Sequence, residues 1–299
     1  DGIHNSNESS TTSDTLGNFV LPGVNGFGQL IVSGGIDIST GVAFTGSMMA
    51  PPGSTVITPL TTLIDKLTQI NGMTVTDATA KVLASLGLHP GVDLLHFDPI
   101  FETNRTDTGK TESNIALAIH TAAVKVSILI SQTGALLRGA GVLTNEAAAI
   151  DLTYEALAAS LASNVSNTDL IDLTADNTIA QIIQETTELS GANNSVLFKI
   201  GALAADASQA IANLNKAVVN ASTSSSDKSK ILSSIAAVQI VSEHIESTMK
   251  SDASTGNVES TVSSTTGSTL NNAITIAGTT VGDVTGDGLP DPLPLPPAP

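Results

Sequence analysis

The most constraining feature of this chain is the long apolar stretch in its middle, residues 115–137. These residues are apolar on nearly every side of a helix, which predicts a central helix that other helices bury. Polar residues at His120, Lys125 and Gln132 interrupt the stretch, so it lacks the unbroken apolar run that a membrane span needs. We therefore expect no membrane insertion, and a helical core built around this segment.

A helical domain is expected over residues 58–251, and its clearest helix has apolar residues at alternating steps of three and four. This spacing forms a heptad seam, typical of helices packed side by side. The seam consists of Leu197, Ile200, Ala204, Ala207, Ile211, Leu214 and Val218. A polar run at residues 222–226 separates this helix from the next. The pattern predicts two short helices and then an antiparallel bundle of about five helices.

Local signals set the ends of the two short helices. Thr58 is suited to an N-cap and Pro59 to the first helical position, so the first helix should begin there and stop near Gly72. The second is expected over residues 76–86, with Gly87 closing it in the left-handed conformation.

Both ends of the chain are expected to contain β-structure. The N-terminal arm and segment, residues 1–57, has β-type runs at residues 29–32 and 42–45. The C-terminal segment, residues 252–299, has a similar run at residues 270–281 before its Pro-rich tail. The expected fold class is therefore α+β, mostly α: an antiparallel helical bundle with β-structured N- and C-terminal segments.

Composition restricts both the core and the partners. The chain is 41% hydrophobic but only 2% aromatic, so Ala, Leu, Ile and Val must build the core, and Ala-rich helices must approach closely. The formal net charge is -17, and all eleven Lys and Arg residues lie from Lys66 to Lys250. Such a charge repels nucleic-acid phosphates and anionic lipids, so we expect no nucleic-acid partner.

No catalytic constellation is visible in the sequence. There is no Cys, which excludes disulfides and thiolate chemistry. The five histidines form no His-x-x-x-His pair, and no Gly-x-Ser-x-Gly elbow occurs. We expect that the protein is not an enzyme.

A candidate calcium loop lies near the C-terminus. Its ligands are expected to be the side-chain oxygens of Asp283, Thr285, Asp287 and Asp291 and the carbonyl of Leu289. Oxygens on alternate residues, with Gly288 at the sharp turn, suit Ca²⁺, a hard cation that takes several oxygen ligands. Pro294 stands where an EF-hand has its bidentate Glu, which suggests weaker binding or another ligand. The alternative is a solvated Asp/Gly turn.

One region resembles known proteins. Residues 34–41 (GGIDISTG) and 50–63 (APPGSTVITPLTTL), with Phe97-Asp98-Pro99, resemble segments of very large secreted bacterial surface proteins. Those proteins are adhesin-like or surface-layer-like and often carry calcium-binding repeats. The resemblance covers roughly a quarter of the chain, residues 34–99. It implies an extracellular location at the cell surface and a structural or adhesive role.

These observations lead to two alternative functions. The first is an extracellular structural subunit of a bacterial surface filament or layer, assembled from copies of itself by strand exchange and stiffened by calcium. The second is an adhesin module that binds a glycan or host protein through its Ser/Thr-rich ends. Self-assembly on adding calcium would favour the first, and a soluble monomer that binds a glycan would favour the second.

Overall fold

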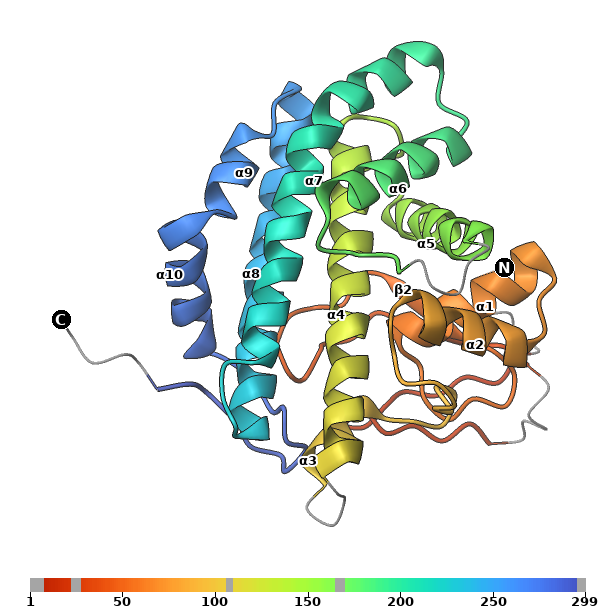
Figure 1. Cartoon of the computed structure of the whole chain (residues 1–299), viewed down its shortest axis with the longest axis vertical. Coiled ribbons are helices and arrows are strands. Elements are labelled where there is room, and N and C mark those ends of the chain that lie inside the picture. The colour runs from red at the N-terminus through yellow and green to blue at the C-terminus, as the bar shows by residue number, and fades with distance from the viewer. Residues whose placement is uncertain (1–7, 23–27, 106–109, 165–169, 295–299) are drawn as a thin grey trace.

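The computed structural model describes residues 8–22, 28–105, 110–164 and 170–294 (Figure 1). This part of the chain is mostly helical, with ten helices and a small antiparallel sheet of two strands. In chain order the elements are β1 Leu30–Ser33, β2 Ser47–Ala50, α1 Pro59–Asn71, α2 Val75–Ser85, α3 Pro99–Asn104, α4 Lys110–Gly139, α5 Glu146–Ser163, α6 Asp176–Leu189, α7 Asn194–Ser222, α8 Lys228–Thr255, α9 Glu259–Ser264 and α10 Gly267–Gly278.

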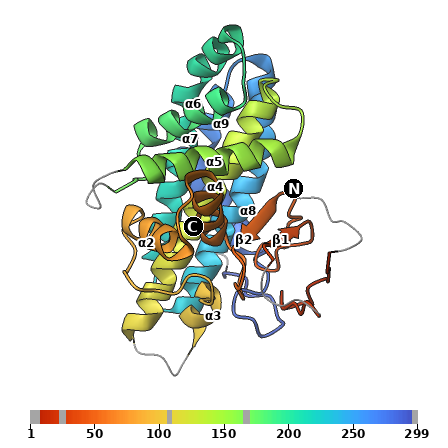
Figure 2. The same ribbon diagram turned by 90° about the vertical axis from the view of Figure 1, so that its right-hand side faces the viewer.

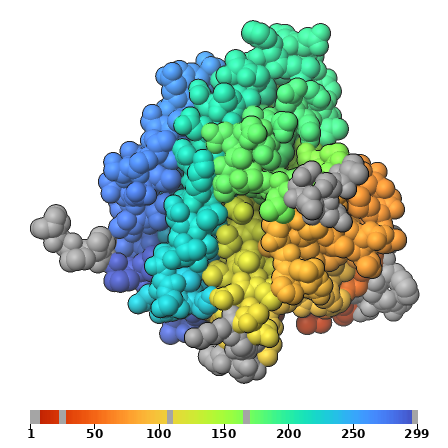
Figure 3. Space-filling view, viewed as in Figure 1, coloured from red at the N-terminus to blue at the C-terminus, as the bar shows by residue number. Residues whose placement is uncertain are grey.

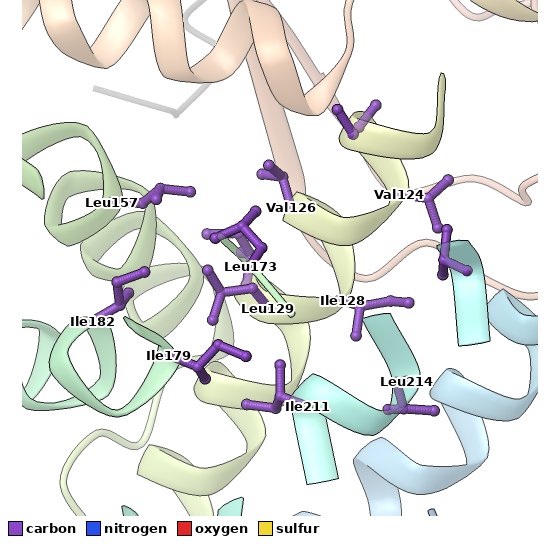
Figure 4. Packing of buried hydrophobic residues seen from close by; sticks show 14 of the residues in the cluster. Val124, Val126, Ile128, Leu129, Leu157, Leu173, Ile179, Ile182, Ile211 and Leu214 are labelled. Carbon is purple, nitrogen blue, oxygen red and sulfur yellow. The ribbon is translucent and has the colours of Figure 1, made fainter. Parts of the chain in front are cut away.

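Helix α4 runs through the middle of the molecule, as its apolar sequence predicts (Figure 1). It packs against α1, α3, α5, α6, α7 and α8. Its Val126, Leu129 and Leu136 are completely buried, and Figure 4 shows Val126 and Leu129 among apolar residues of the neighbouring helices. By length and composition α4 could cross a membrane, but 67% of its most apolar window is buried, as in the core helix of a folded domain. Part of α4 reaches the surface between α7 and the N-terminal helices (Figure 3).

The heptad seam on α7 is buried from Ile200 to Val218 as the sequence predicts, whereas its first residue, Leu197, is only half-buried. Residues Ala207, Ile211, Leu214 and Val218 have no exposed surface, and α7 packs along α6, α8 and α4. Leu203, which stands beside the seam in the heptad pattern, is also buried.

The crossing of α4 and α8 depends on a glycine. A Cβ atom on Gly139 would overlap the carbonyl oxygen of Lys250 and crowd the side chain of Ala253. Gly139 therefore allows the backbones of the two helices to come together, which a core poor in aromatic residues requires in order to fill its space.

We predict that Gly139→Ala lowers the free energy of unfolding by about 1–3 kcal/mol, because the added methyl group must push α4 and α8 apart. Gly201→Ala is the matched control. Gly201 is an exposed position inside α7 with no atom within 4 Å of an added Cβ. The control should instead stabilise the protein by up to about 1 kcal/mol. Urea unfolding measures both, and equal stabilities of wild type and Gly139→Ala would contradict the close contact.

The two short helices end where the local signals predict. Thr58 caps α1 by accepting a hydrogen bond from the amide of Thr61, and Gly72 ends α1 in the left-handed conformation. Helix α2 is followed by Gly87, also left-handed.

The N-terminal β-structure differs from the expectation in its second strand. β1 overlaps the expected run at residues 29–32 and pairs with β2, with Leu30 opposite Ala50 and Ser33 opposite Ser47. The expected strand at residues 42–45 is wrong: this run makes only an isolated bridge between Ile36 and Ala43. It lies within the turn that joins β1 to β2.

The expected C-terminal strand is also wrong, because residues 270–278 belong to α10. The β-branched run around Ile274 and Ile276 suggests a strand, but Leu270, Ala273, Ile274 and Ala277 recur with helical spacing. These four residues pack against the core, and α10 lies against α8. Ile276 is 67% exposed. Tertiary packing of one helical face therefore outweighs the local strand propensity.

Candidate calcium-binding loop

The candidate loop follows α10 and is closed on itself. The amide of Asp291 donates to the carbonyl of Gly282 at 2.9 Å, so the two ends of the loop lie side by side. One carboxylate oxygen of Asp283 accepts from the amides of Thr285 (3.2 Å) and Gly286 (2.7 Å). Its other oxygen accepts from the amide of Gly288 at 2.7 Å. Asp283 thereby organises the turn around its own side chain.

The carboxylate of Asp291 binds amides of the same turn. Its Oδ2 accepts from the amides of Val284 and Thr285 and from the hydroxyl of Thr285, each at 3.0 Å. Two of the expected carboxylate ligands, Asp283 and Asp291, therefore both accept hydrogen bonds from a third expected ligand residue, Thr285. A carboxylate oxygen has more than one acceptor site, so these contacts leave capacity for a cation.

The other two expected ligand residues, Asp287 and Leu289, lie apart from the hydrogen bonds that connect Asp283, Thr285 and Asp291. Asp287 is exposed, and its Oδ1 accepts from the amide of Leu289 at 2.9 Å. The side chain of Leu289 is 66% exposed. Within the described residues, no three His, Cys, Asp or Glu side chains are grouped to hold a metal ion. Full coordination by all five residues would need Asp287 to turn inward.

The loop is anchored to the turn between β1 and β2, a contact that the sequence analysis did not anticipate. The amides of Gly282 and Asp283 donate to the carbonyls of Ser39 (2.9 Å) and Ile38 (3.0 Å). A Cβ on Gly282 would overlap the Ile38 carbonyl oxygen, so this approach requires glycine. Figures 1 and 2 show the C-terminal loop beside N-terminal segments near α3. Gly282, directly before the acidic loop, is the only signal in the sequence that could have suggested this contact with Ile38 and Ser39.

A second anchor holds the loop to the helices. Val284 is 3% exposed, and its carbonyl accepts from the side-chain amide of Asn104, the last residue of α3, at 3.0 Å. Val284 and Ser39 line a small cavity together with Ile100, His120, Leu232, Ala236 and Gln239. The loop therefore covers the place where α3, α4 and α8 meet.

His120 of α4 faces this cavity and is half-buried. Burial lowers the pKa of His120 to about 4, although the carboxylates of Asp37 and Asp98 act in the opposite direction. The folded protein therefore holds His120 neutral at a pH where an unfolded chain would protonate it.

We predict that this histidine makes the fold acid-sensitive. The pKa of His120 is lower in the folded state, so the unfolded state binds the proton more tightly, and stability falls as pH drops from 6.5 towards about 4. His120→Gln should show a smaller fall in melting temperature over this range than the wild type. The exposed His89, changed to Gln, is the control and should follow the wild type. Identical pH profiles for all three proteins would contradict the prediction.

The structure also contains a partly buried charged cluster that sequence reasoning missed. Lys66 is 4% exposed and forms ion pairs with Asp151 and, at 3.4 Å, with Glu155 of α5. The neighbouring Asp65 accepts hydrogen bonds from the side chains of Gln29 (2.5 Å) and Gln69 (2.6 Å). Burial raises the pKa of Asp65. These contacts join α1 to α5 and to Gln29, the residue that precedes β1. The signal in the sequence is the pair of charged residues, Asp65 and Lys66, in the middle of an otherwise uncharged helix.

Comparison with protein-family models, with curated proteins and with solved structures finds no match for this chain.

Proposed function

We propose that this protein is an extracellular structural subunit that assembles with copies of itself into a bacterial surface filament or layer. In this proposal the helices form an antiparallel bundle that serves as the rigid body of each subunit. The observation that carries the proposal is the outer edge of β1, which pairs with no other strand in the part of the chain that the structure describes. The sequence resemblance of residues 34–99 to secreted bacterial surface proteins supports the extracellular location.

The two edges of the small sheet differ. Helix α1 covers the outer edge of β2: the Met49 amide donates to the Thr62 hydroxyl at 2.9 Å, and the Met49 carbonyl accepts from the hydroxyls of Thr61 and Thr62. Among the described residues, β1 pairs with no strand other than β2. β1 lies on the side of β2 away from the helices (Figure 2). An uncovered edge is a template for a strand from another chain.

The N-terminal segment carries apolar side chains suited to such an interface. Its exposed large apolar residues are Leu16, Val20, Ile31, Ile36 and Ile38. Residues 8–22 form no helix or strand and lie mostly at the surface. We propose that this arm adds to the β1 edge of a neighbouring copy. A head-to-tail contact of this kind does not close, so its repetition builds a filament.

Calcium has a stiffening role in the proposal, with Asp283, Thr285, Asp287, the Leu289 carbonyl and Asp291 as ligands. Support comes from the all-oxygen donor set and from the contacts that already join Asp283, Thr285 and Asp291. A cation would draw the exposed Asp287 inward and fix the loop. It would hold the loop's oxygens in place and supply no further chemistry.

The calcium site is tested through stability. We expect millimolar calcium to raise the melting temperature of the wild type, and Asp287→Ala to abolish this rise while changing the calcium-free protein little, because Asp287 is exposed. Asp206→Ala is the control: it removes one negative charge from α7, outside the loop. This variant should keep the calcium-dependent rise in melting temperature. A wild-type melting curve that is the same with calcium and with chelator would exclude the site.

The assembly is tested by removing the arm. Deleting residues 1–22 leaves β1, β2 and the Gln29–Asp65 hydrogen bond in place, so it removes the donor strand but keeps the acceptor edge. We expect a folded helical monomer that no longer polymerises. A truncated protein that assembles like the full chain would exclude strand donation by the arm. If the full chain stays monomeric and binds a glycan array, the adhesin function replaces this proposal.

A further inference from the structure

We propose that the C-terminal loop, residues 282–291, acts as a latch that holds the turn between β1 and β2. This turn, residues 34–46, is called the flap below. The latch controls whether the flap stays docked on the helices, and with it the position of the β1 edge. The two segments are far apart in the sequence but in direct backbone contact.

The flap is a compact unit held by its own hydrogen bonds. The amide of Asp37 donates to the Val42 carbonyl at 2.9 Å, and the amide of Phe44 donates to the Gly35 carbonyl at 3.0 Å. The carboxylate of Asp37 accepts from the amide and the hydroxyl of Ser39. Only Ser39, Thr40 and Gly46 of the flap are buried, so once the flap leaves the helices these bonds are exposed to water and open more often.

The flap has different attachments at its base and at its tip. At the base, the hydroxyl of Thr45 donates to Glu146 at 2.6 Å, and Gly46 lies against Ile150. At the tip, the backbone hydrogen bonds from Gly282 and Asp283 hold Ile38 and Ser39. The base is thus fixed to α5 while the latch holds the tip, an arrangement that suits a hinge at the base.

Asp283 connects the shape of the loop to the flap. Asp283 donates its amide to the flap, and its carboxylate accepts three amides of the loop. Reshaping the loop must therefore move the donor that holds Ile38. Only the link to assembly and to calcium rests on the proposed function; the latch itself rests on the contacts described here. Such coupling is reciprocal, so loosening the flap must also loosen the loop.

The test is hydrogen exchange of the full chain in chelator, read by mass spectrometry. In Gly282→Ala, whose new methyl group displaces the Ile38 carbonyl, the amides of Asp37 and Phe44 should exchange about tenfold faster or more. Amides of α7 should exchange at the wild-type rate, as should all amides in the Gly201→Ala control. Faster exchange confined to the loop, with an unchanged flap, would overturn the latch.

The reverse variant tests reciprocity and protects against a Gly282→Ala protein that does not fold. Asp37→Ala removes the acceptor of Ser39 and should speed exchange of the Gly286 and Gly288 amides, which lie outside the flap. Unchanged loop amides beside a loosened flap would also overturn the proposal. The readout involves neither calcium nor polymerisation, so coupled exchange in a protein that never assembles would refute the proposed function and leave the latch standing.

Discussion

The close contact of α4 and α8 at Gly139 is the constraint on which the rest of the structure depends. With almost no aromatic side chains, the core has to fill its space by bringing backbones together. Once α4 is packed against α8, its remaining apolar faces need cover, and α5 and α7 supply it. The buried Lys66 then fixes α1 to α5 through its carboxylate partners, which extends the helical core towards the sheet.

The terminal segments are held by hydrogen bonds and close backbone approach. Cysteine is absent, so no disulfide can fasten them. Gln29 ties the start of β1 to Asp65, and Gly282 lets the C-terminal loop reach the turn between the strands. Within the loop only Val284 belongs to the buried apolar core, so opening the loop loses less apolar burial than unfolding a helix would. That difference suits a subunit whose ends make contacts with neighbours and whose body stays rigid.

The sequence predicted the parts of the fold that local patterns determine. The apolar character of α4, the seam on α7 and the cap at Thr58 all follow from residue spacing or local hydrogen bonding. Helix α10 was missed because its short β-branched run resembles a strand, and only packing on α8 decides the outcome. In the loop, spacing anticipated the contacts among Asp283, Thr285 and Asp291. It could not anticipate the docking on Ile38, because two backbone hydrogen bonds across more than half the chain leave almost no sequence pattern.

The central claim is that the N-terminal arm, residues 8–22, adds to the outer edge of β1 in a neighbouring copy and so joins copies of this chain. Negative-stain electron microscopy of the full-length protein at high concentration tests this claim most directly, with calcium and with chelator compared side by side. The account predicts filaments or a lattice in calcium, with fewer or less regular assemblies in chelator. Monodisperse single particles in both conditions would contradict it.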